Sequence, residues 1–331
     1  MSETRIPPPI LEYKEKQVHG TLNTLPLPVK FVTAPPKQTY MNIPSFNIKD
    51  TPSRSQQYTE TTEKTLKSSY YIEFSDGYSF RSLLEYLKLT ILKGSIVVMK
   101  NGIYHSSCSN SGDALYEFEI FACELPSFIY DSELEEIVEG IDFSAITPVT
   151  KNMKKKCWVK LFREVENRNI FIKIFSTGTS IQNIHPVLVY NFRYTNYSVS
   201  ELFENKNPIC TIPLDDFCGT MDTQHKNNGK LSNISIFDKG IVIVDEQRVN
   251  NSPVGQFGVT SGDDPIYMMS VDTKHLKDFS KMKNIGERSC VKIYYGEDET
   301  YAYLMFEFKI GHYGNLRTTL RQKIAKNHAD I

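Results

Sequence analysis

The stretch GSIVVMKNGIY, residues 94–104, recurs in form as SNISIFDKGIV, residues 232–242. Each stretch predicts a strand, a turn at a glycine and a second strand, and Asn101-Gly102 is a typical two-residue hairpin turn. Strand patterns of this kind can resemble one another by chance. Two similar segments that lie far apart in one chain nevertheless indicate a structural unit that is repeated in the fold.

The elements that follow each hairpin keep the same order. Residues 141–146, IDFSAI, begin a predicted helix that ends in lysines and leads into a strand at 157–162. Residues 271–276, VDTKHL, begin another lysine-bearing helix, which leads into a strand at 290–295. Each half then closes with a strongly β segment, at 170–175 or at 301–310. This preserved order favours a duplicated α+β unit over chance similarity.

Composition divides the chain into an N-terminal segment and two domains. Residues 1–66 hold nine of the sixteen prolines and are rich in Thr, Ser and Gln. This composition predicts a disordered tail, although apolar patches at Phe31 and at 40–46 could dock on another surface. We expect a first domain at 67–194, a connecting loop at 195–208 and a second domain at 209–331.

Several function classes lack their sequence signals. No apolar run approaches the roughly 20 residues of a membrane-spanning helix, and residues 1–9 lack the apolar centre of a signal peptide. The six cysteines show no metal-ligand spacing, so we expect reduced thiols of an intracellular protein and no metal site.

No common catalytic motif is present either. The sequence contains no phosphate-binding loop, HExxH or GxSxG motif. The adjacent aspartates at 215–216 and 263–264 fit a helix start and a turn. We therefore expect no enzyme and no cofactor, an expectation that a deep pocket gathering Asp215, Asp222 and His225 would reverse.

The net charge is −1. A surface that binds a polyanion would therefore need Lys and Arg to gather on one side of the protein, apart from the acidic residues. On a helix over 272–285 we expect Leu276, Phe279 and Lys283 on the buried side, with lysines opposite. A helix around 146–155 likewise has an apolar stripe opposite lysines, and helices at 79–93 and 214–228 add further cations beside acids. The predicted phosphate-binding set is Arg81, Lys88, Lys151, Lys154, Lys155, Lys226, Lys274, Lys277, Lys281 and Arg288. Lysine-rich faces at equivalent places of the repeat favour one basic surface that attracts phosphates regardless of base sequence.

Three segments resemble the proliferating cell nuclear antigen family of DNA sliding clamps. Residues 304–317, LMFEFKIGHYGNLR, are similar to the closing strand and turn of that family. Residues 140–146, GIDFSAI, resemble the start of the second helix of its first domain, and residues 213–217, PLDDF, the opening of its second domain. The resemblance covers about residues 69–324.

The resemblance implies a DNA clamp fold of two similar domains, each with antiparallel sheets and two helices, that closes as a homotrimer around duplex DNA. It implies a non-enzymatic DNA polymerase processivity factor that also tethers replication and repair clients, with a clamp loader as a further candidate partner. The divergence indicates a viral member that acts in the host nucleus or at a cytoplasmic viral replication site.

The resemblance also implies two protein-binding regions. The client groove would comprise Cys108, Tyr197, Val199, Leu202, Phe203, Leu320, Arg321, Gln322 and Ile324. Here Arg321-Gln322 replace the family's Ala-Pro, which questions binding of the usual client peptide. The subunit contact would pair an edge strand at 170–175 with residues 241–245 of the next protomer, through Ile170, Phe171, Ile172, Ile174, Ile241, Val242, Ile243 and Val244.

Two other interpretations stay open. One is a monomeric processivity factor, or a clamp-like viral late transcription factor, that does not close a ring. The other is a structural or virion protein with an unrelated repeat, whose basic helix faces would be incidental. Solution mass and retention on circular DNA separate these interpretations from a ring.

Overall fold

A computed structural model describes residues 68–324 except 152, 166–168, 177–181, 192–193, 226–229, 246–252, 261 and 287. The predicted tail at 1–66 and the predicted phosphate-binding residue Lys226 lie outside the described residues. Among the described residues, no helix is both long and apolar enough to cross a membrane. No three potential metal ligands cluster there.

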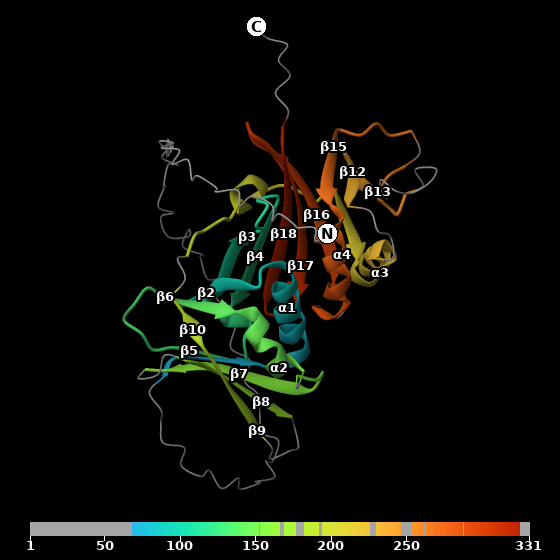
Figure 1. Ribbon diagram of the computed structural model, residues 1–331. Helices are drawn as coiled ribbons and strands as arrows, with labels where there is room; N and C mark the ends of the chain where they lie inside the picture. The colour runs from blue at the N-terminus through green and yellow to red at the C-terminus, as the bar shows by residue number, and fades with distance from the viewer. Residues whose placement is uncertain are drawn as a thin grey trace, which may run out of the picture. The chain divides into compact units, whose positions relative to one another are not determined.

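The two halves share the order of their main elements, and the first half has the additional strands β5 and β10 (Figure 1). The first half contains β1 (Ser68–Phe74), α1 (Gly77–Thr90), β2 (Lys93–Met99), β3 (Gly102–Cys108), β4 (Ala114–Phe121), η1 (Ala122–Glu124), β5 (Ser127–Tyr130), β6 (Glu136–Asp142), η2 (Phe143–Ile146), α2 (Thr147–Thr150), β7 (Cys157–Glu164), β8 (Ile170–Ser176), β9 (Gln182–Val187) and β10 (Val189–Tyr190). The second half contains η3 (Ser200–Phe203), β11 (Cys210–Pro213), α3 (Leu214–His225), β12 (Leu231–Phe237), β13 (Gly240–Asp245), β14 (Gly255–Phe257), β15 (Tyr267–Asp272), α4 (Thr273–Asp278), η4 (Phe279–Asn284), β16 (Cys290–Glu297), β17 (Tyr301–Ile310) and β18 (Gly314–Lys323).

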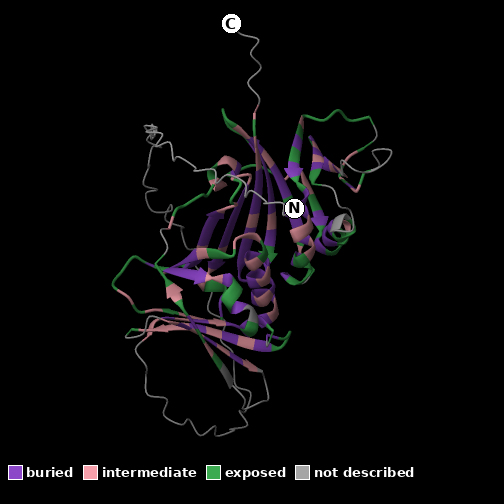
Figure 2. Cartoon of the chain, in the orientation of Figure 1, coloured by how far each residue is buried: buried purple, intermediate pink, exposed green. Residues whose placement is uncertain are grey.

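Three antiparallel sheets organise these strands. A nine-stranded sheet has the order β10-β6-β2-β3-β4-β18-β17-β16-β11, so the two halves join where β4 pairs with β18. A five-stranded sheet, β5-β1-β7-β8-β9, belongs to the first half, and a four-stranded sheet, β14-β13-β12-β15, to the second. Figure 2 shows buried residues along the strands of the nine-stranded sheet. The predicted α+β architecture with two helices in each half is confirmed.

The repeated stretches form the predicted hairpins. Residues 94–104 supply β2 and β3, which turn at Gly102, and residues 232–242 supply β12 and the start of β13, which turn at Gly240. Gly102 has a φ of 148°, and an added Cβ would lie 1.9 Å from the Ile120 carbonyl oxygen. Only glycine fits such a turn.

The helices differ in length from their predictions. α1 buries Phe80, Leu83, Leu84 and Leu87 along one side, and Ile91 just past its end is half-buried. The helix predicted across 146–155 is a short 3₁₀ turn followed by α2, and Lys151, Lys154 and Lys155 lie beyond its end.

One residue was assigned to the wrong side of its helix. Lys283 is exposed, whereas Met282 is buried beside Leu276 and Phe279. The reason is that α4 continues as the 3₁₀ helix η4, in which every third residue falls on the same side.

The predicted edge strand is also wrong. β8, which contains Ile170, Phe171, Ile172 and Ile174, lies between β7 and β9. β13, which contains Ile241, Val242, Ile243 and Val244, lies between β12 and β14. β9 is the edge strand next to β8, and β14 is the edge strand next to β13. The unpaired backbone groups at these edges therefore belong to β9 and β14.

Side chains also tie the halves together at the central junction. His275 of α4 places Nδ1 3.0 Å from the Tyr116 hydroxyl and Nε2 3.1 Å from Asp113 Oδ1. Tyr313 of the last hairpin accepts a hydrogen bond from the Asp76 backbone N–H at 2.6 Å, next to the start of α1. The helices are therefore fixed to the sheets by contacts that cross from one half to the other.

Acid should destabilise the protein through His105, which is fully buried in β3. The Ser95 carbonyl accepts from its Nδ1 at 2.8 Å, and Ser107 Oγ lies 2.9 Å from its Nε2. Burial lowers the pKa of His105 from its usual 6.5 to about 4. Because the unfolded chain binds this proton at higher pH, the free energy of unfolding should fall by about 3 kcal/mol as pH drops from 6.5 to about 4. Urea unfolding across that range measures the loss.

The matched control is His105→Leu, which removes the titrating group but fills much of its volume. Its free energy of unfolding at neutral pH is expected to be lower, because Ser95 and Ser107 lose their partner. Its dependence on pH in this window should nevertheless be weaker. An equally steep dependence in the variant would show that other groups cause the acid effect.

Candidate nucleic-acid interface

The helices of both halves form one layer. α1 packs against η2 and α2 on one side and against α4 and η4 on the other, and α3 packs against α4 and η4. The order across the layer is therefore α2, α1, α4 with η4, and α3. α1 also contacts β7 and β17, so the layer rests on strands of two sheets.

A hollow of about 500 Å³ lies between α1, α2 and η4, and cations from both halves line it. Arg81 and Lys88 come from α1, Lys151 from the end of α2, and Lys281 and Lys283 from η4. Arg81 donates to the Met153 carbonyl at 3.3 Å, which holds its guanidinium beside the end of α2. Residues far apart in the sequence thus converge on one basic hollow.

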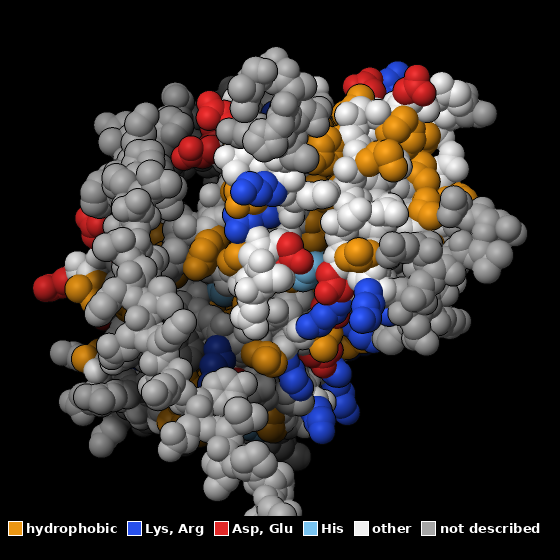
Figure 3. All heavy atoms as spheres, turned by 45° about the horizontal axis from the view of Figure 1, so that its top comes forward, with side chains coloured by type: hydrophobic (Ala, Val, Ile, Leu, Met, Phe, Trp, Pro, Cys, Tyr) orange, Lys and Arg blue, Asp and Glu red, His pale blue; other side chains and the backbone are white. Residues whose placement is uncertain are grey.

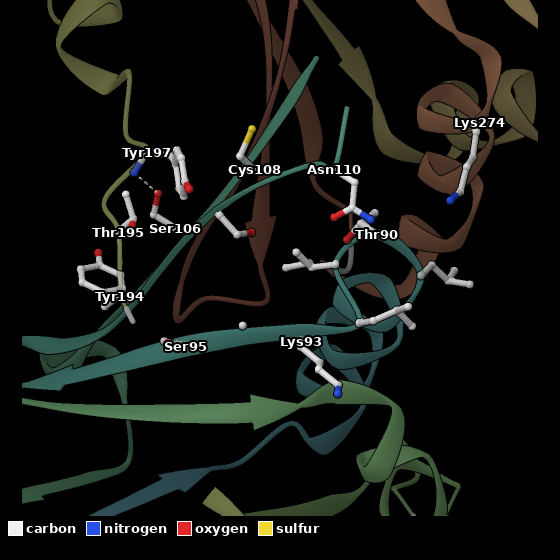
Figure 4. Close-up of a pocket in the computed structure, with 15 residues that line it drawn as sticks. Thr90, Lys93, Ser95, Ser106, Cys108, Asn110, Tyr194, Thr195, Tyr197 and Lys274 are labelled. Carbon is white, nitrogen blue, oxygen red and sulfur yellow. Dashed lines mark hydrogen bonds between the residues drawn. The ribbon is translucent and has the colours of Figure 1, made fainter. Parts of the chain in front are cut away.

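Neighbouring hollows carry the positive charge further. One of about 570 Å³ is lined by Lys155, Lys156, Lys283 and Arg288, together with Asp76 and Asp215. A third hollow of about 400 Å³ is lined by Lys93 from β2 and Lys274 from α4, but also by Cys108 and Tyr197, so it lies where the helix layer meets the connecting loop (Figure 4). Lys154 and Lys274 are exposed and Lys277 is half-buried. The structure therefore places most of the predicted cations on one layer, and we call this layer the basic helix surface.

Three cations of this surface were absent from the sequence prediction. Lys93 is the last residue of one predicted helix, Lys156 follows the end of another, and Lys283 was assigned to the buried side. The period of three in Leu276, Phe279 and Met282 could have revealed a 3₁₀ helix and thus the exposure of Lys283.

Acidic side chains limit the positive charge at identifiable places. Glu85 lies in the hollow between α1 and η4, where its carboxylate pairs with Arg81 at 2.8 Å. α3 exposes Asp215, Asp216 and Asp222, so this helix contributes little positive charge among its described residues. Figure 3 shows Lys and Arg side chains gathered on part of one face with Asp and Glu among them.

The basic helix surface suits attraction to phosphates. Lysines predominate, and ammonium groups act on phosphates as point charges without selecting a base. Exposed charges of this kind act over about 10 Å at moderate salt. The surface can therefore hold a nucleic-acid backbone without fixing its register.

The connecting loop is fixed to the opposite side of the nine-stranded sheet. The Tyr197 backbone N–H donates to Ser106 Oγ at 2.8 Å, and Ser200 Oγ donates to Glu117 at 2.8 Å. Phe203 is buried against Tyr294, with 6.3 Å between ring centroids. Val199 and Leu202 pack on the same small cluster, which also contains Tyr303 and Met305.

The predicted client groove is brought together only in part. Cys108 and Tyr197 line the same hollow (Figure 4). Arg321 lies over the Tyr301 ring at 4.9 Å and donates to the Gly112 carbonyl. Gln322 accepts from the Ser270 N–H at 2.9 Å, and Ile324 packs on the core.

The prediction that Leu320 lines that groove is wrong. It has no exposed surface, because its β18 strand lies between β4 and β17 and its side chain points into the core. A bound peptide cannot reach this side chain unless the sheet opens.

Among the described side chains, the two candidate aspartates of α3 are not gathered in one pocket. Asp215 and Asp222 are exposed, and of these two only Asp215 lines the hollow beside Arg288. The side chain of His225 lies outside the described residues. Burial raises the pKa of Cys210 to about 11 and is the largest cause of the rise in the pKa of Cys218 to about 12, which disfavours the thiolate form of both.

Solved clamps have the same fold. The proliferating cellular nuclear antigen of Entamoeba histolytica is similar with a TM-score of 0.61 and 15% identity, over 78% of this chain and 100% of that one. A chain of the PCNA2–PCNA3 complex of Sulfolobus tokodaii is similar with a TM-score of 0.60 and 14% identity, over 76% of this chain and 98% of that one. No protein-family model matches the chain, and no curated protein matches its sequence. The chain therefore has the fold of these structures.

Proposed function

We propose that this protein is a DNA sliding clamp, a processivity factor that encircles duplex DNA and tethers replication and repair proteins. The observation that carries the proposal is the basic hollow between α1, α2 and η4, where cations from both halves meet. The likeness to solved clamps supports the same arrangement. Phosphate attraction without base contacts leaves a ring free to move along the duplex.

The internal repeat supports a ring of identical chains. Within one chain, β4 of the first half pairs with β18, the last strand of the second half. The equivalent strands are β14 and β9, and both lie at sheet edges. Pairing of β9 with β14 of the next copy would repeat the central junction between chains. Head-to-tail contacts of this kind close into a ring when the rotation from one copy to the next divides a full turn evenly. We propose a ring of three copies, a homotrimer.

The connecting loop is the proposed landing site for DNA polymerase and other clients. Its attachment through Tyr197, Ser200 and Phe203 leaves Tyr197 41% exposed beside Cys108. Arg321 and Gln322 make this region more polar than an Ala-Pro pair would, so clients with polar or acidic contacts should fit it better. We further propose a viral origin, a loader as partner, and action in the host nucleus or at a cytoplasmic replication site.

Retention on circular DNA tests the function directly. The full chain, loaded on a nicked plasmid by a matching loader or by high protein concentration, is expected to stay bound in salt that removes contacts governed by charge alone. Cutting the plasmid once should release it, because a ring slides off a free end. Equal retention on both forms would contradict encirclement and favour a non-ring processivity factor. No retention on either form, together with a monomeric mass of 38.0 kDa, would favour a structural protein.

A further inference from the structure

The five-stranded sheet has one side that faces the helices and one that faces away. Tyr70, Ile72, Val159 and Leu161 alternate along β1 and β7 and are buried, and α1 contacts β7 on this side. Figure 1 shows α1 and α2 on one side of the sheet. The residues between the buried ones point to the other side and are half-buried. An antiparallel sheet with one solvated side normally carries polar residues there.

This outward side carries aromatic residues instead, and we call it the aromatic face: Tyr71, Trp158, Phe162, Phe171 and Phe175. Tyr71 lies opposite Phe162, which lies opposite Phe171, so three rings cross adjacent strands in one row. Trp158 lies opposite Phe175 in a second row. The Phe162 and Phe171 centroids are 5.4 Å apart, and those of Trp158 and Phe175 are 6.3 Å apart.

Two lysines separate the aromatic rows. Lys160 and Lys173 lie opposite each other on β7 and β8. The Lys160 ammonium is 5.2 Å from the Tyr71 centroid and 5.1 Å from that of Phe175, and it pairs with Glu73 at 3.3 Å. The central row thus contains two ammonium groups and the carboxylate of Glu73.

This combination favours a polyanion over a protein partner. Protein interfaces concentrate aromatic residues at their centre but deplete lysine there, whereas this face has lysines at its centre. Proteins that bind single strands combine positive charge with aromatic side chains that contact unpaired bases, and sheet surfaces are used in this way. We propose that the aromatic face binds single-stranded nucleic acid, with bases against the rings and phosphates near Lys160 and Lys173.

This site is separate from the basic helix surface, because helices and aromatic face lie on opposite sides of the five-stranded sheet. The inference does not rest on the clamp function, and it goes beyond it. A protein with both sites could hold a duplex at its helices and a single strand at this sheet.

Trp158 is the only tryptophan of the chain, so its fluorescence reports on this face. Titration of the full chain with oligothymidylate of about 20 nucleotides is expected to quench Trp158 emission to saturation, because bases stack against the rings. Oligouridylate in a parallel titration distinguishes RNA from DNA as the preferred strand. A duplex of equal length and inorganic polyphosphate should quench little, since they present charge without unpaired bases.

Variants separate this face from the basic helix surface. Lys173→Glu keeps every ring and should weaken oligothymidylate binding about tenfold, and Phe171→Ala should weaken it by a similar factor. The pair Lys151→Glu with Lys281→Glu, on the helices, should leave the quenching of Trp158 unchanged. Thermal melting of each variant identifies any that fail to fold, and Lys173→Glu then carries the test.

Three results would overturn the proposal. One is the absence of saturable quenching by either oligonucleotide. Another is quenching by duplex or polyphosphate as strong as that by the single strands, which would show attraction by charge alone. The third is a response only to vesicles of anionic lipid, or only to rising concentration of the protein itself, which would assign the face to a membrane or to a second copy.

Discussion

Replacing Lys151 and Lys281 together by glutamate is expected to lower the affinity for duplex DNA by about 100-fold at low salt. The two ammonium groups line the hollow between α1, α2 and η4, one from each half. Each replacement removes an attraction to phosphate and adds a repulsion. The slope of log affinity against log salt should also become shallower, by about 0.9 for each phosphate that the protein no longer neutralises. Fluorescence anisotropy of a labelled duplex over a range of salt measures both effects.

Glu85→Gln is the matched control, because it changes charge in the same hollow with the opposite sign. Its carboxylate is 44% exposed and pairs with Arg81, so neutralisation adds net positive charge at little cost in stability. The affinity for duplex DNA should rise about threefold. Unchanged affinity in the lysine double variant would refute the basic helix surface as the duplex site. A decrease in Glu85→Gln would point to damage of the hollow rather than to charge.

Local patterns in the sequence were sufficient for the repeat and the helix faces. The two hairpins could be predicted because Gly102 and Gly240 mark turns between alternating strands. The exposed position of Lys274 followed from the apolar stripe on the other side of its helix, since a helix buries one face. These features depend on residues that are close together in the sequence, which is why a single sequence is enough to predict them.

Features that depend on contacts between distant segments were not predictable. Nothing near Ile170 shows that β9 covers the outer side of its strand, because pairing depends on a strand more than ten residues further along the chain. Leu320 was placed in the client groove by resemblance, but its strand pairs with β4 of the other half and its side chain is buried. Lys283 is a different case: it was misplaced because an α-helical period was assumed, although the period of three in Leu276, Phe279 and Met282 indicates a 3₁₀ helix.

The convergence of Arg81, Lys151 and Lys281 belongs to the same class. The sequence predicts an exposed position for each of these three cations. Only the packing of α1 between α2 and η4 makes the three cations neighbours. The aromatic face was missed for a different reason. Its strands were recognised, but Phe162 and Phe171 fitted a buried strand as well as an exposed one until the register was known.

The repeat predicts the residue register of the proposed contact between chains. In the strand before the first helix of each half, Thr211 pairs with Lys292 and Glu73 pairs with Lys160. Aligning the halves on these two lysines sets the row Lys292, Glu307, Arg317 against the row Lys160, Lys173, Ile184. Arg317 pairs with Glu117 on β4. Glu117 lies three residues before Ile120, and Ile120 pairs with Ile103, the residue after the turn glycine Gly102. In the second half Phe257 pairs with Ile241 beside the equivalent turn, so Val254 corresponds to Glu117. Ile184 should therefore lie opposite Val254 of the next copy.

Ile184→Glu combined with Val254→Glu is accordingly expected to dissociate the assembly, because it sets carboxylates directly opposite each other at every junction. Light scattering should change from about three times 38.0 kDa to the mass of one chain. Ile184→Arg with Val254→Glu should keep the assembly, since it recreates the Arg317–Glu117 pair that joins the halves at 2.8 Å. Ile184 is 53% exposed, so either change costs little in one chain. Dissociation by the complementary pair as well would exclude this register, and an intact assembly in the double glutamate variant would exclude the β9–β14 contact altogether.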